Sequence, residues 1–246
     1  MNISKINLHV HSNFSDGRNS IEQIVKRGIQ LEMEFICITD HFSNSWKSNI
    51  IPTLNTREKI ELYLKNISNS NRSLIEKKDK LRVLKGIEID ISSDIDYITR
   101  LVNPMKFDLI LFEYLENFEG IAFISNLIDD WRYFLPQNKT FPHLGLAHFD
   151  PKLFFSSNFN PLIQFMMKYN IFYEFNSSYP HSYSLKYQSF FQKLKERNIQ
   201  FSIGSDSHEL ESLLEIETPL RMIEHYNLQD NYQNLLEKLK KISLKN

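Results

Sequence analysis

Short apolar segments alternate with longer helical patterns along almost the whole of this 246-residue chain, and this alternation limits the folds open to it. Seven segments have the length and the Ile, Val, Leu, Phe and Tyr content of strands, and they cover residues 6–11, 35–41, 82–91, 107–114, 144–149, 171–176 and 201–206. Several are apolar almost throughout, which is typical of strands buried on both faces of a parallel sheet. Strands that alternate with helices predict an α/β fold with a mainly parallel sheet.

Helical periodicity fills most of the gaps between the strands. Ser20 and Gln23 have the spacing of a capping box at the start of the first helix. Further helices are expected at about residues 56–81, 119–134, 161–169, 183–197, 210–225 and 228–244. No Pro- or Gly-rich linker divides the chain, so we expect a single domain over residues 1–246. The irregular stretches 42–55 and 177–182 follow strands and are expected to form loops at the mouth of a site.

The charge balance gives no indication of a protein that binds nucleic acid by electrostatics alone, because 29 Lys and Arg residues face 30 Asp and Glu residues. Cys37 is the only cysteine, so an internal disulfide is impossible, and its apolar neighbours predict a buried side chain. No apolar run approaches the length of a membrane span, and the N-terminal segment lacks a signal-peptide pattern. We therefore expect no membrane association and a cytoplasmic location.

Each of the seven candidate strands carries a potential metal ligand at or near its C-terminal end. These residues are His9, His11, Asp40, His41, Glu88, Asp90, Glu113, His148, Asp150, Glu174, Asp206 and His208. In a parallel barrel the C-terminal strand ends lie on one face, where the active site is built. Taken singly, Asp40 could cap the following segment and Asp206 could belong to a turn. Seven polar strand ends together instead predict one shared site with His and carboxylate metal ligands.

Six motifs of the chain resemble, in the same order, those of the PHP (polymerase and histidinol phosphatase) family. They are His9-Val-His11, Ser15-Asp16-Gly17, Ile38-Thr39-Asp40-His41, Gly86-Ile-Glu88, Ala147-His148 and Gly204-Ser-Asp206-Ser-His208. The first motif alone is a weak signal, but the joint match is specific and extends over nearly the whole chain. The resemblance implies a distorted (β/α)7 barrel with the site at the C-terminal ends of the strands. It also implies a cluster of two or three divalent metal ions, with manganese, iron and zinc all compatible.

Carried over motif by motif, the resemblance implies three metal positions. The first would be held by His9, His11, Glu88 and Asp206. Glu88 would bridge to the second, which His148 joins, and the third would be held by Asp16, His41 and His208. Asp40 is expected to orient ligands without binding metal.

The segment after the fourth predicted strand departs from the family pattern. PHP proteins commonly have a histidine there that binds the second metal, whereas residues 108–115 of this chain contain none. Glu113 is the best candidate for a substitute, and the alternative is that Glu113 is a solvated loop residue. In the second case a centre with two metals remains plausible and one with three is in doubt.

Clustered divalent metals suit hydrolysis at phosphorus, because a bound metal brings the pKa of water from 15.7 toward about 7. The resulting hypothesis is a metal-dependent phosphoesterase in which metal-bound water or hydroxide attacks phosphorus without a covalent intermediate. Asp206, His148 and His208 are the catalytic candidates, and either histidine could protonate the leaving oxygen.

A small phosphomonoester is the leading substrate class, since neither an extra domain nor a basic stripe is evident. Candidate substrate contacts are Arg18, Asn176, His181 and Lys186. A phosphodiesterase or nuclease acting on nucleotides or nucleic-acid ends is the first alternative. A metal-binding module without catalysis is the second, supported by the missing histidine. The sequence leaves the oligomeric state open.

Overall fold

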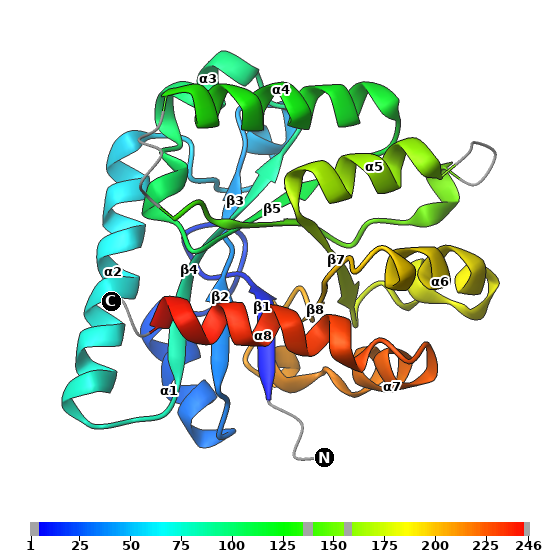
Figure 1. Ribbon diagram of the computed structural model, residues 1–246. Helices are drawn as coiled ribbons and strands as arrows, with labels where there is room; N and C mark the ends of the chain where they lie inside the picture. The colour runs from blue at the N-terminus through cyan, green and yellow to red at the C-terminus, as the bar shows by residue number, and fades with distance from the viewer. Residues whose placement is uncertain (1–4, 135–139, 155–158, 244–246) are drawn as a thin grey trace.

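The computed structural model describes residues 5–134, 140–154 and 159–243. Seven parallel strands follow one another around a curved sheet in the order β1-β2-β4-β5-β6-β7-β8. Their bounds are β1 (Ile6–Val10), β2 (Phe35–Ile38), β4 (Arg82–Asp90), β5 (Leu109–Glu113), β6 (His143–Leu146), β7 (Ile171–Asn176) and β8 (Phe201–Gly204). A bridge between Val10 and Ser207 brings the first and last strands together. The predicted distorted barrel of seven strands is confirmed (Figure 1).

The predicted strand at residues 35–41 is divided in the structure. It ends at Ile38 as β2, and the chain resumes pairing with β4 as the two-residue strand β3 (His41–Phe42). The register between β1 and β2 shifts at the same level, between Asn7 and Val10. The division leaves Asp40 outside the strands, where its carboxylate accepts hydrogen bonds from the loop that follows β1.

The described residues form eight α-helices, six of which lie between strands, while the last two follow the last strand. They are α1 (Ile21–Gln30), α2 (Arg57–Glu76), α3 (Ile95–Leu101), α4 (Phe118–Phe134), α5 (Asn160–Tyr169), α6 (Gln188–Glu196), α7 (Glu217–His225) and α8 (Gln229–Ser243). The predicted capping box is present, with Ser20 and Gln23 each accepting a hydrogen bond from the other's backbone N–H. The predicted end of the last helix at residue 244 lies outside the described residues.

Two predicted helices start later than the pattern indicated. The helix expected at 183–197 begins at Gln188, after two short 3₁₀ turns. The helix expected at 210–225 is a 3₁₀ turn followed by α7, which begins at Glu217. Pro219 explains the second break, because proline has no N–H for the carbonyl of Glu215 and its ring would collide with it in a continuous helix. In α7 the proline falls in the first turn, where no such bond is needed.

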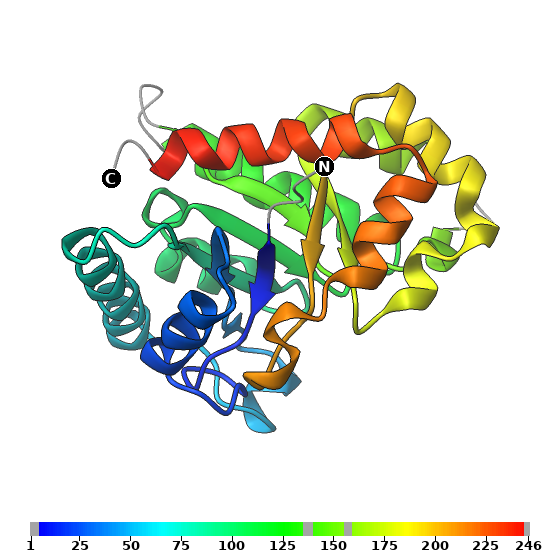
Figure 2. The same ribbon diagram turned by 90° about the horizontal axis from the view of Figure 1, so that it is seen from below.

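Helix α8 lies across the N-terminal ends of the strands (Figures 1 and 2). The Asn231 side chain donates to the carbonyl of Ile199 just before β8 at 2.8 Å, and Lys240 pairs with Glu34 just before β2 at 3.1 Å. The helix buries Leu235 against the sheet. This end of the barrel is therefore covered, which leaves the C-terminal ends of the strands for a site. Among the described residues, no helix has the combination of length and apolar character needed to span a bilayer.

Candidate metal centre

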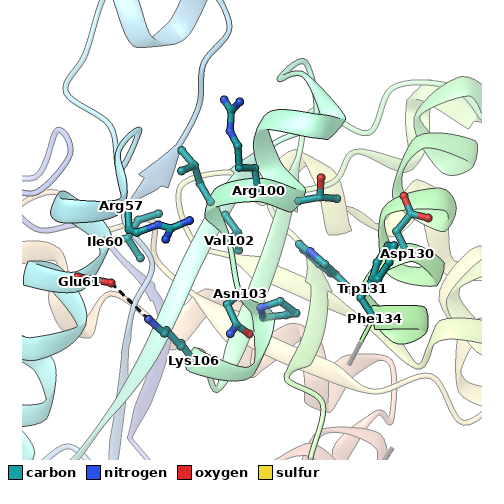
Figure 3. Close-up of a pocket in the computed structure, with 13 residues that line it drawn as sticks. Arg57, Ile60, Glu61, Arg100, Val102, Asn103, Lys106, Asp130, Trp131 and Phe134 are labelled. Atoms are coloured by element: carbon teal, nitrogen blue, oxygen red, sulfur yellow. Dashed lines mark ion pairs between the residues drawn. The ribbon is translucent and has the colours of Figure 1, made fainter. Parts of the chain in front are cut away.

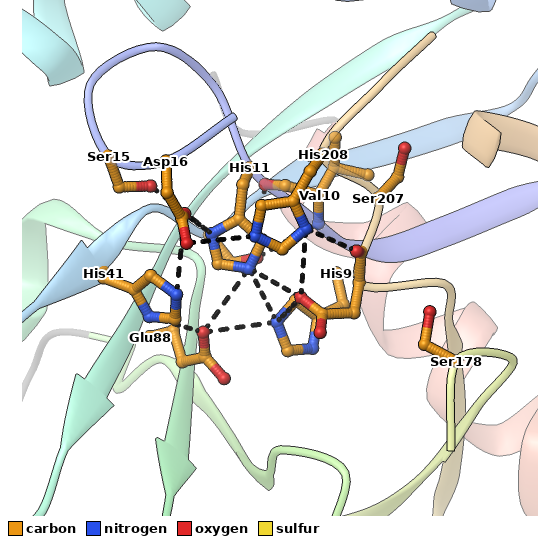
Figure 4. Close-up of polar contacts among 12 residues, drawn as sticks. His9, Val10, His11, Ser15, Asp16, His41, Glu88, Ser178, Ser207 and His208 are labelled. Carbon is orange, nitrogen blue, oxygen red and sulfur yellow. Dashed lines mark hydrogen bonds and ion pairs between the residues drawn. The ribbon is translucent and has the colours of Figure 1, made fainter. Parts of the chain in front are cut away.

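The C-terminal ends of the strands bring together all nine residues that the sequence proposed as metal ligands. They are His9, His11, Asp16, His41, Glu88, Glu113, His148, Asp206 and His208. Figure 4 shows most of these side chains pointing toward one another from β1, the loop after β1, β3, β4 and the segment after β8. Their ligand atoms form three groups in which every atom lies within 4.8 Å of the others, and His148 approaches Glu88 beside them.

The first group consists of His9, His11 and Asp206. The two Nε2 atoms lie 3.0 Å apart, and Asp206 Oδ1 lies 3.4 Å from that of His9 and 2.9 Å from that of His11. Glu88 Oε2 is 3.3 and 3.4 Å from the same two nitrogens. Ligands held about 2.0–2.2 Å from one ion are about 3.0–3.5 Å apart, because the angles between bonds are close to 90–109°. The spacing therefore fits four ligands around one divalent cation.

The second group consists of His11, Asp16, His41 and His208. Asp16 Oδ2 lies 3.2 Å from His208 Nε2, and Asp16 Oδ1 lies 3.6 Å from His41 Nε2 and 3.7 Å from His11 Nδ1. The loop after β1 carries Asp16 into place. This arrangement brings together the three residues expected at the third metal position, with His11 next to them.

Buried oxygens without hydrogen-bond donors test whether these groups suit cations. Neither carboxylate oxygen of Glu88, nor Asp16 Oδ1, has a well-aligned donor among the described residues, although all three atoms are buried. Histidine nitrogens lie near them, as His41 Nδ1 does at 2.8 Å from Glu88 Oε2. Buried polar atoms are almost always satisfied, and a cation would satisfy these. The donor set of imidazole nitrogens and carboxylate oxygens fits manganese, iron or zinc.

The third group consists of His41, Glu88 and Glu113. Glu113 is 1% exposed, so it is not the solvated loop residue of the alternative interpretation. Its two carboxylate oxygens lie 2.8 and 2.7 Å from the Nζ atom of Lys47. His148 Nε2 approaches Glu88 Oε1 at 3.2 Å but belongs to none of the three groups.

Carboxylates outside the groups orient the candidate ligands. Glu174 Oε1 lies 2.9 Å from His9 Nδ1, so in a neutral ring this nitrogen would carry the proton and Nε2 would be available to a cation. Its other oxygen accepts from the backbone N–H of His148 at 2.7 Å. Gly204 permits this approach, because a Cβ atom there would lie 2.1 Å from Glu174 Oε1. The sequence had indicated only that Glu174 is one of the polar residues at the strand ends.

Asp40 holds the loop that carries Asp16. Its carboxylate accepts from the backbone N–H groups of Ser12 and Ser15 at 2.8 and 3.1 Å and from both hydroxyls at 2.5 Å. Burial raises the pKa of Asp40 to about 6 even though these hydrogen bonds favour its charged form. The geometry agrees with the expectation that Asp40 orients ligands without binding metal.

Three residues at strand ends have left-handed backbone conformations, with φ of 66° at Tyr114, 34° at His148 and 52° at Asp206. Residues other than glycine rarely adopt this backbone conformation, which costs about 1–2 kcal/mol per residue. Each of them follows a strand of the barrel, so the chain turns sharply where the site begins. Such strain concentrates at functional sites.

The clustered charges shift one another's pKa. Burial lowers the pKa of His9, but the three surrounding carboxylates more than reverse this and raise it well above its ordinary value. Burial and the positive charge of His41 lower the pKa of His11 to about 4. Burial opposes the charge of Glu88, yet its histidine neighbours hold the pKa of this carboxyl well below its usual range. The carboxylate is therefore ionised and available to a cation.

A cavity of about 490 Å³ opens above the centre. Both irregular stretches line it, as expected: residues 42–55 contribute Trp46 and Lys47, and residues 177–182 contribute Tyr179 and His181. Tyr179 stacks on the ring of His148, with centroids 4.4 Å apart. The sequence located these loops but did not single out the lysine or the aromatic residues, since nothing in an irregular segment shows which side chains turn inward.

The four candidate substrate contacts lie in different surroundings. His181 lines the cavity, whereas Asn176 is buried with Nδ2 3.5 Å from His9 Nδ1. Arg18 is exposed and pairs with Glu209 at 2.9 Å, and Lys186 lies over the ring of Tyr187. Neither Arg18 nor Lys186 lines the cavity. His181 thus has the position that substrate contact requires, and Asn176 does not line the cavity.

A separate hollow of about 550 Å³ lies on the outside of the barrel between α2, α3 and α4 (Figure 3). Arg57, Arg100 and Trp131 line it, and Lys106 pairs with Glu61 there at 3.8 Å. None of the three groups of potential metal ligands found in the described part of the chain lies in it. The cavity above the strand ends is therefore the better candidate for an active site.

Comparison with known proteins supplies independent findings. The PHP domain family matches residues 7–243. The DNA polymerase/3'-5' exonuclease PolX of Bacillus subtilis (strain 168) is 25% identical over an alignment of 222 residues, which covers 87% of this chain and 36% of that protein. The chain thus spans about a third of the length of this relative.

Two solved structures share the fold. A provisionally assigned histidinol phosphatase from Listeria monocytogenes has a TM-score of 0.57 at 15% identity, with 85% of this chain and 97% of that chain covered. The histidinol phosphate phosphatase of Lactococcus lactis subsp. lactis Il1403, in complex with zinc, L-histidinol and phosphate, has a TM-score of 0.54 at 16% identity, with 91% and 94% covered. At these identities the likeness establishes a common barrel architecture.

Proposed function

The chain belongs to the PHP domain family, and on this premise we propose that it is a metal-dependent phosphoesterase that hydrolyses a small phosphomonoester. One observation carries the proposal: buried carboxylate oxygens without donors lie among converging histidines at the base of an open cavity. Manganese, iron or zinc ions bound there would lower the pKa of water and offset the charge of a phosphoryl group. The relatives described as phosphatases support the same reaction class.

The residues of the chain have distinct parts in this proposal. His9, His11 and Asp206 hold one cation with Glu88, and Glu174 keeps the His9 ring in the required tautomer. His148 lines the cavity and belongs to none of the ligand groups of the described residues, so we assign to its imidazole the transfer of a proton to the leaving oxygen. His208, the other candidate acid, is itself a member of the second ligand group.

The lining of the cavity favours a small substrate over a nucleic acid. Lys47 is the one lysine among its lining residues, which include no arginine, and it is already paired with Glu113. A polyanion needs several free cationic side chains along its backbone. The rim instead exposes Trp46, Ile50 and Leu153, which offer apolar contact to the alcohol part of an ester. We therefore infer a phosphomonoester with an apolar or aromatic group.

A phosphodiesterase or nuclease activity is the second candidate, favoured by the likeness to the Bacillus subtilis polymerase and exonuclease. Turnover of p-nitrophenyl phosphate, its bis ester and a short single-stranded oligonucleotide, each with added manganese, separates the two. We expect the monoester to be hydrolysed fastest and exhaustive chelation to abolish activity. Faster cleavage of the oligonucleotide would identify a nuclease, and full activity after chelation would refute the mechanism.

A matched pair of variants tests the centre itself. Asp206→Asn removes one ligand charge and should abolish turnover, while Asp230→Asn on the exposed face of α8 should leave it unchanged. Protein that binds metal but hydrolyses no phosphate ester in a broad panel would instead indicate a module without catalysis. The cytoplasmic location expected from the sequence stays a prediction.

A further inference from the structure

Lys47 places a positive charge inside the candidate metal centre. It lies in the 3₁₀ turn Trp46–Asn49, and its side chain is only 10% exposed. Its Nζ atom lies 2.8 and 2.7 Å from the two oxygens of Glu113 and 3.1 Å from His41 Nδ1. The ammonium has three protons, and the two carboxylate oxygens of Glu113 accept two of them.

Two of these partners, Glu113 and His41, belong to the third group of potential metal ligands, which Glu88 completes. Glu88 and Glu113 are 0% and 1% exposed, so two negative charges are buried side by side. Buried charges require compensation by an opposite charge or by a metal ion. The ammonium group of Lys47 supplies one compensating positive charge from the protein itself, at a place where a divalent ion would otherwise be needed.

The other two groups lack a comparable side chain. Asp16 and Asp206 form ion pairs with histidines, and no Lys or Arg nitrogen of the described residues lies within ion-pair distance of either. Asp16 Oδ1 also lacks a hydrogen-bond donor, whereas both oxygens of Glu113 are satisfied by Lys47. In the third group only the oxygens of Glu88 remain without a well-aligned donor, and Glu88 Oε2 also faces the two histidines of the first group. Glu113 itself is fully compensated by the lysine.

His41 cannot serve both neighbouring groups. Its Nε2 faces Asp16 at 3.6 Å, while its Nδ1 faces Glu88 at 2.8 Å and Lys47. A neutral imidazole has one free lone pair, so binding an ion beside Asp16 puts the proton on Nδ1. The third group then offers only carboxylates, and one of these is bound to the lysine.

We propose that the ammonium group of Lys47 takes the place of one divalent ion, so that the centre binds two metal ions and not three. The proposal rests on the proposed metal-dependent function and specifies its cation content. The proposal also explains why β5 ends in a glutamate, Glu113, where relatives commonly have a histidine. A carboxylate forms an ion pair with an ammonium group, whereas a neutral histidine would not. The glutamate and the lysine thus form one unit.

Metal content provides the test. Manganese per chain is measured by elemental analysis after gel filtration, and free Mn²⁺ is followed by electron paramagnetic resonance during titration. We expect two ions in the wild type and in Lys47→Arg, which keeps the charge, and three in Lys47→Met, in which Glu113 is uncompensated. Lys65→Met, an exposed position on α2, is the matched control and should bind two.

Loss of Lys47 alone leaves a buried carboxylate unpaired, which could prevent folding. The double variant Lys47→Met with Glu113→His avoids this, because it removes both charges and leaves a neutral nitrogen ligand beside Glu88 and His148. We expect this variant to bind three ions.

The outcomes separate the two proposals. Three ions in the wild type, or two in both the single Lys47→Met variant and the double variant, would overturn the role of Lys47 and leave the metal-dependent hydrolase standing. Wild-type protein that binds no metal would overturn the proposed function and the role of Lys47 with it.

Discussion

Replacement of Glu174 by glutamine should weaken metal binding although Glu174 is not itself a proposed ligand. The two oxygens of Glu174 face two donors, His9 Nδ1 at 2.9 Å and the backbone N–H of His148 at 2.7 Å. Glutamine has the same shape but only one acceptor, so its NH₂ group must face one of these donors. The side chain is buried, and water cannot take over the lost interaction.

The size of the effect follows from this geometry. A hydrogen bond to a charged group contributes about 1.5–3 kcal/mol, and the substitution removes one of two. Since 1.4 kcal/mol corresponds to a factor of ten, metal affinity should fall by roughly 10–100-fold. The same range is typical when the partner of a metal-binding histidine is replaced.

Competition with a chromophoric chelator would measure this affinity for manganese and zinc. Glu224→Gln on the exposed face of α7 is the matched control and should bind as the wild type does. A dissociation constant for Glu174→Gln within twofold of the wild-type value, in a protein with unchanged secondary structure, would refute the argument that Glu174 sets the tautomer of His9.

Gly204→Ala should lower both the melting temperature and the metal affinity, because a Cβ atom there would lie 2.1 Å from Glu174 Oε1 and 2.7 Å from His9 Cβ. Wild-type values in a thermal melt and a metal titration would contradict this expectation. Trp46→Ala should raise the KM for an aryl phosphate several-fold more than the KM for glycerol phosphate, because the Trp46 side chain lines the cavity and is 56% exposed to an incoming ligand. Equal changes in the two KM values would argue against a role of Trp46 in binding the alcohol part of the substrate. Burial lowers the pKa of His143 to about 4, with Lys238 adding to the effect, so the unfolded chain takes up a proton below the ordinary value of 6.5 that the folded chain does not. The free energy of unfolding should therefore fall between pH 6.5 and pH 4, by at most about 3 kcal/mol. The partial exposure of the ring makes the actual loss smaller than this bound. Urea unfolding at several pH values should show a weaker dependence in His143→Gln, and identical dependence would exclude this source.

Most of the barrel could be predicted because its signals are local. Apolar runs of strand length and one capping box depend on neighbours a few residues apart, and the covalent chain fixes those distances. The parallel arrangement then places His9, Glu88 and Asp206 at one end of the barrel without further information. The break before α7 also had a local cause, Pro219, which the apolar periodicity alone did not reveal.

The sequence did not predict which side chains contact one another at the C-terminal ends of the strands. Lys47 and Glu113 are 66 residues apart, and the turn that directs the lysine inward lies in a segment without periodicity. The amino-acid order determined where potential ligands would gather, because strand direction and side-chain alternation are short-range properties. Only the tertiary structure decided which charges neutralise one another, since electrostatic pairing depends on distances through space that no local pattern records.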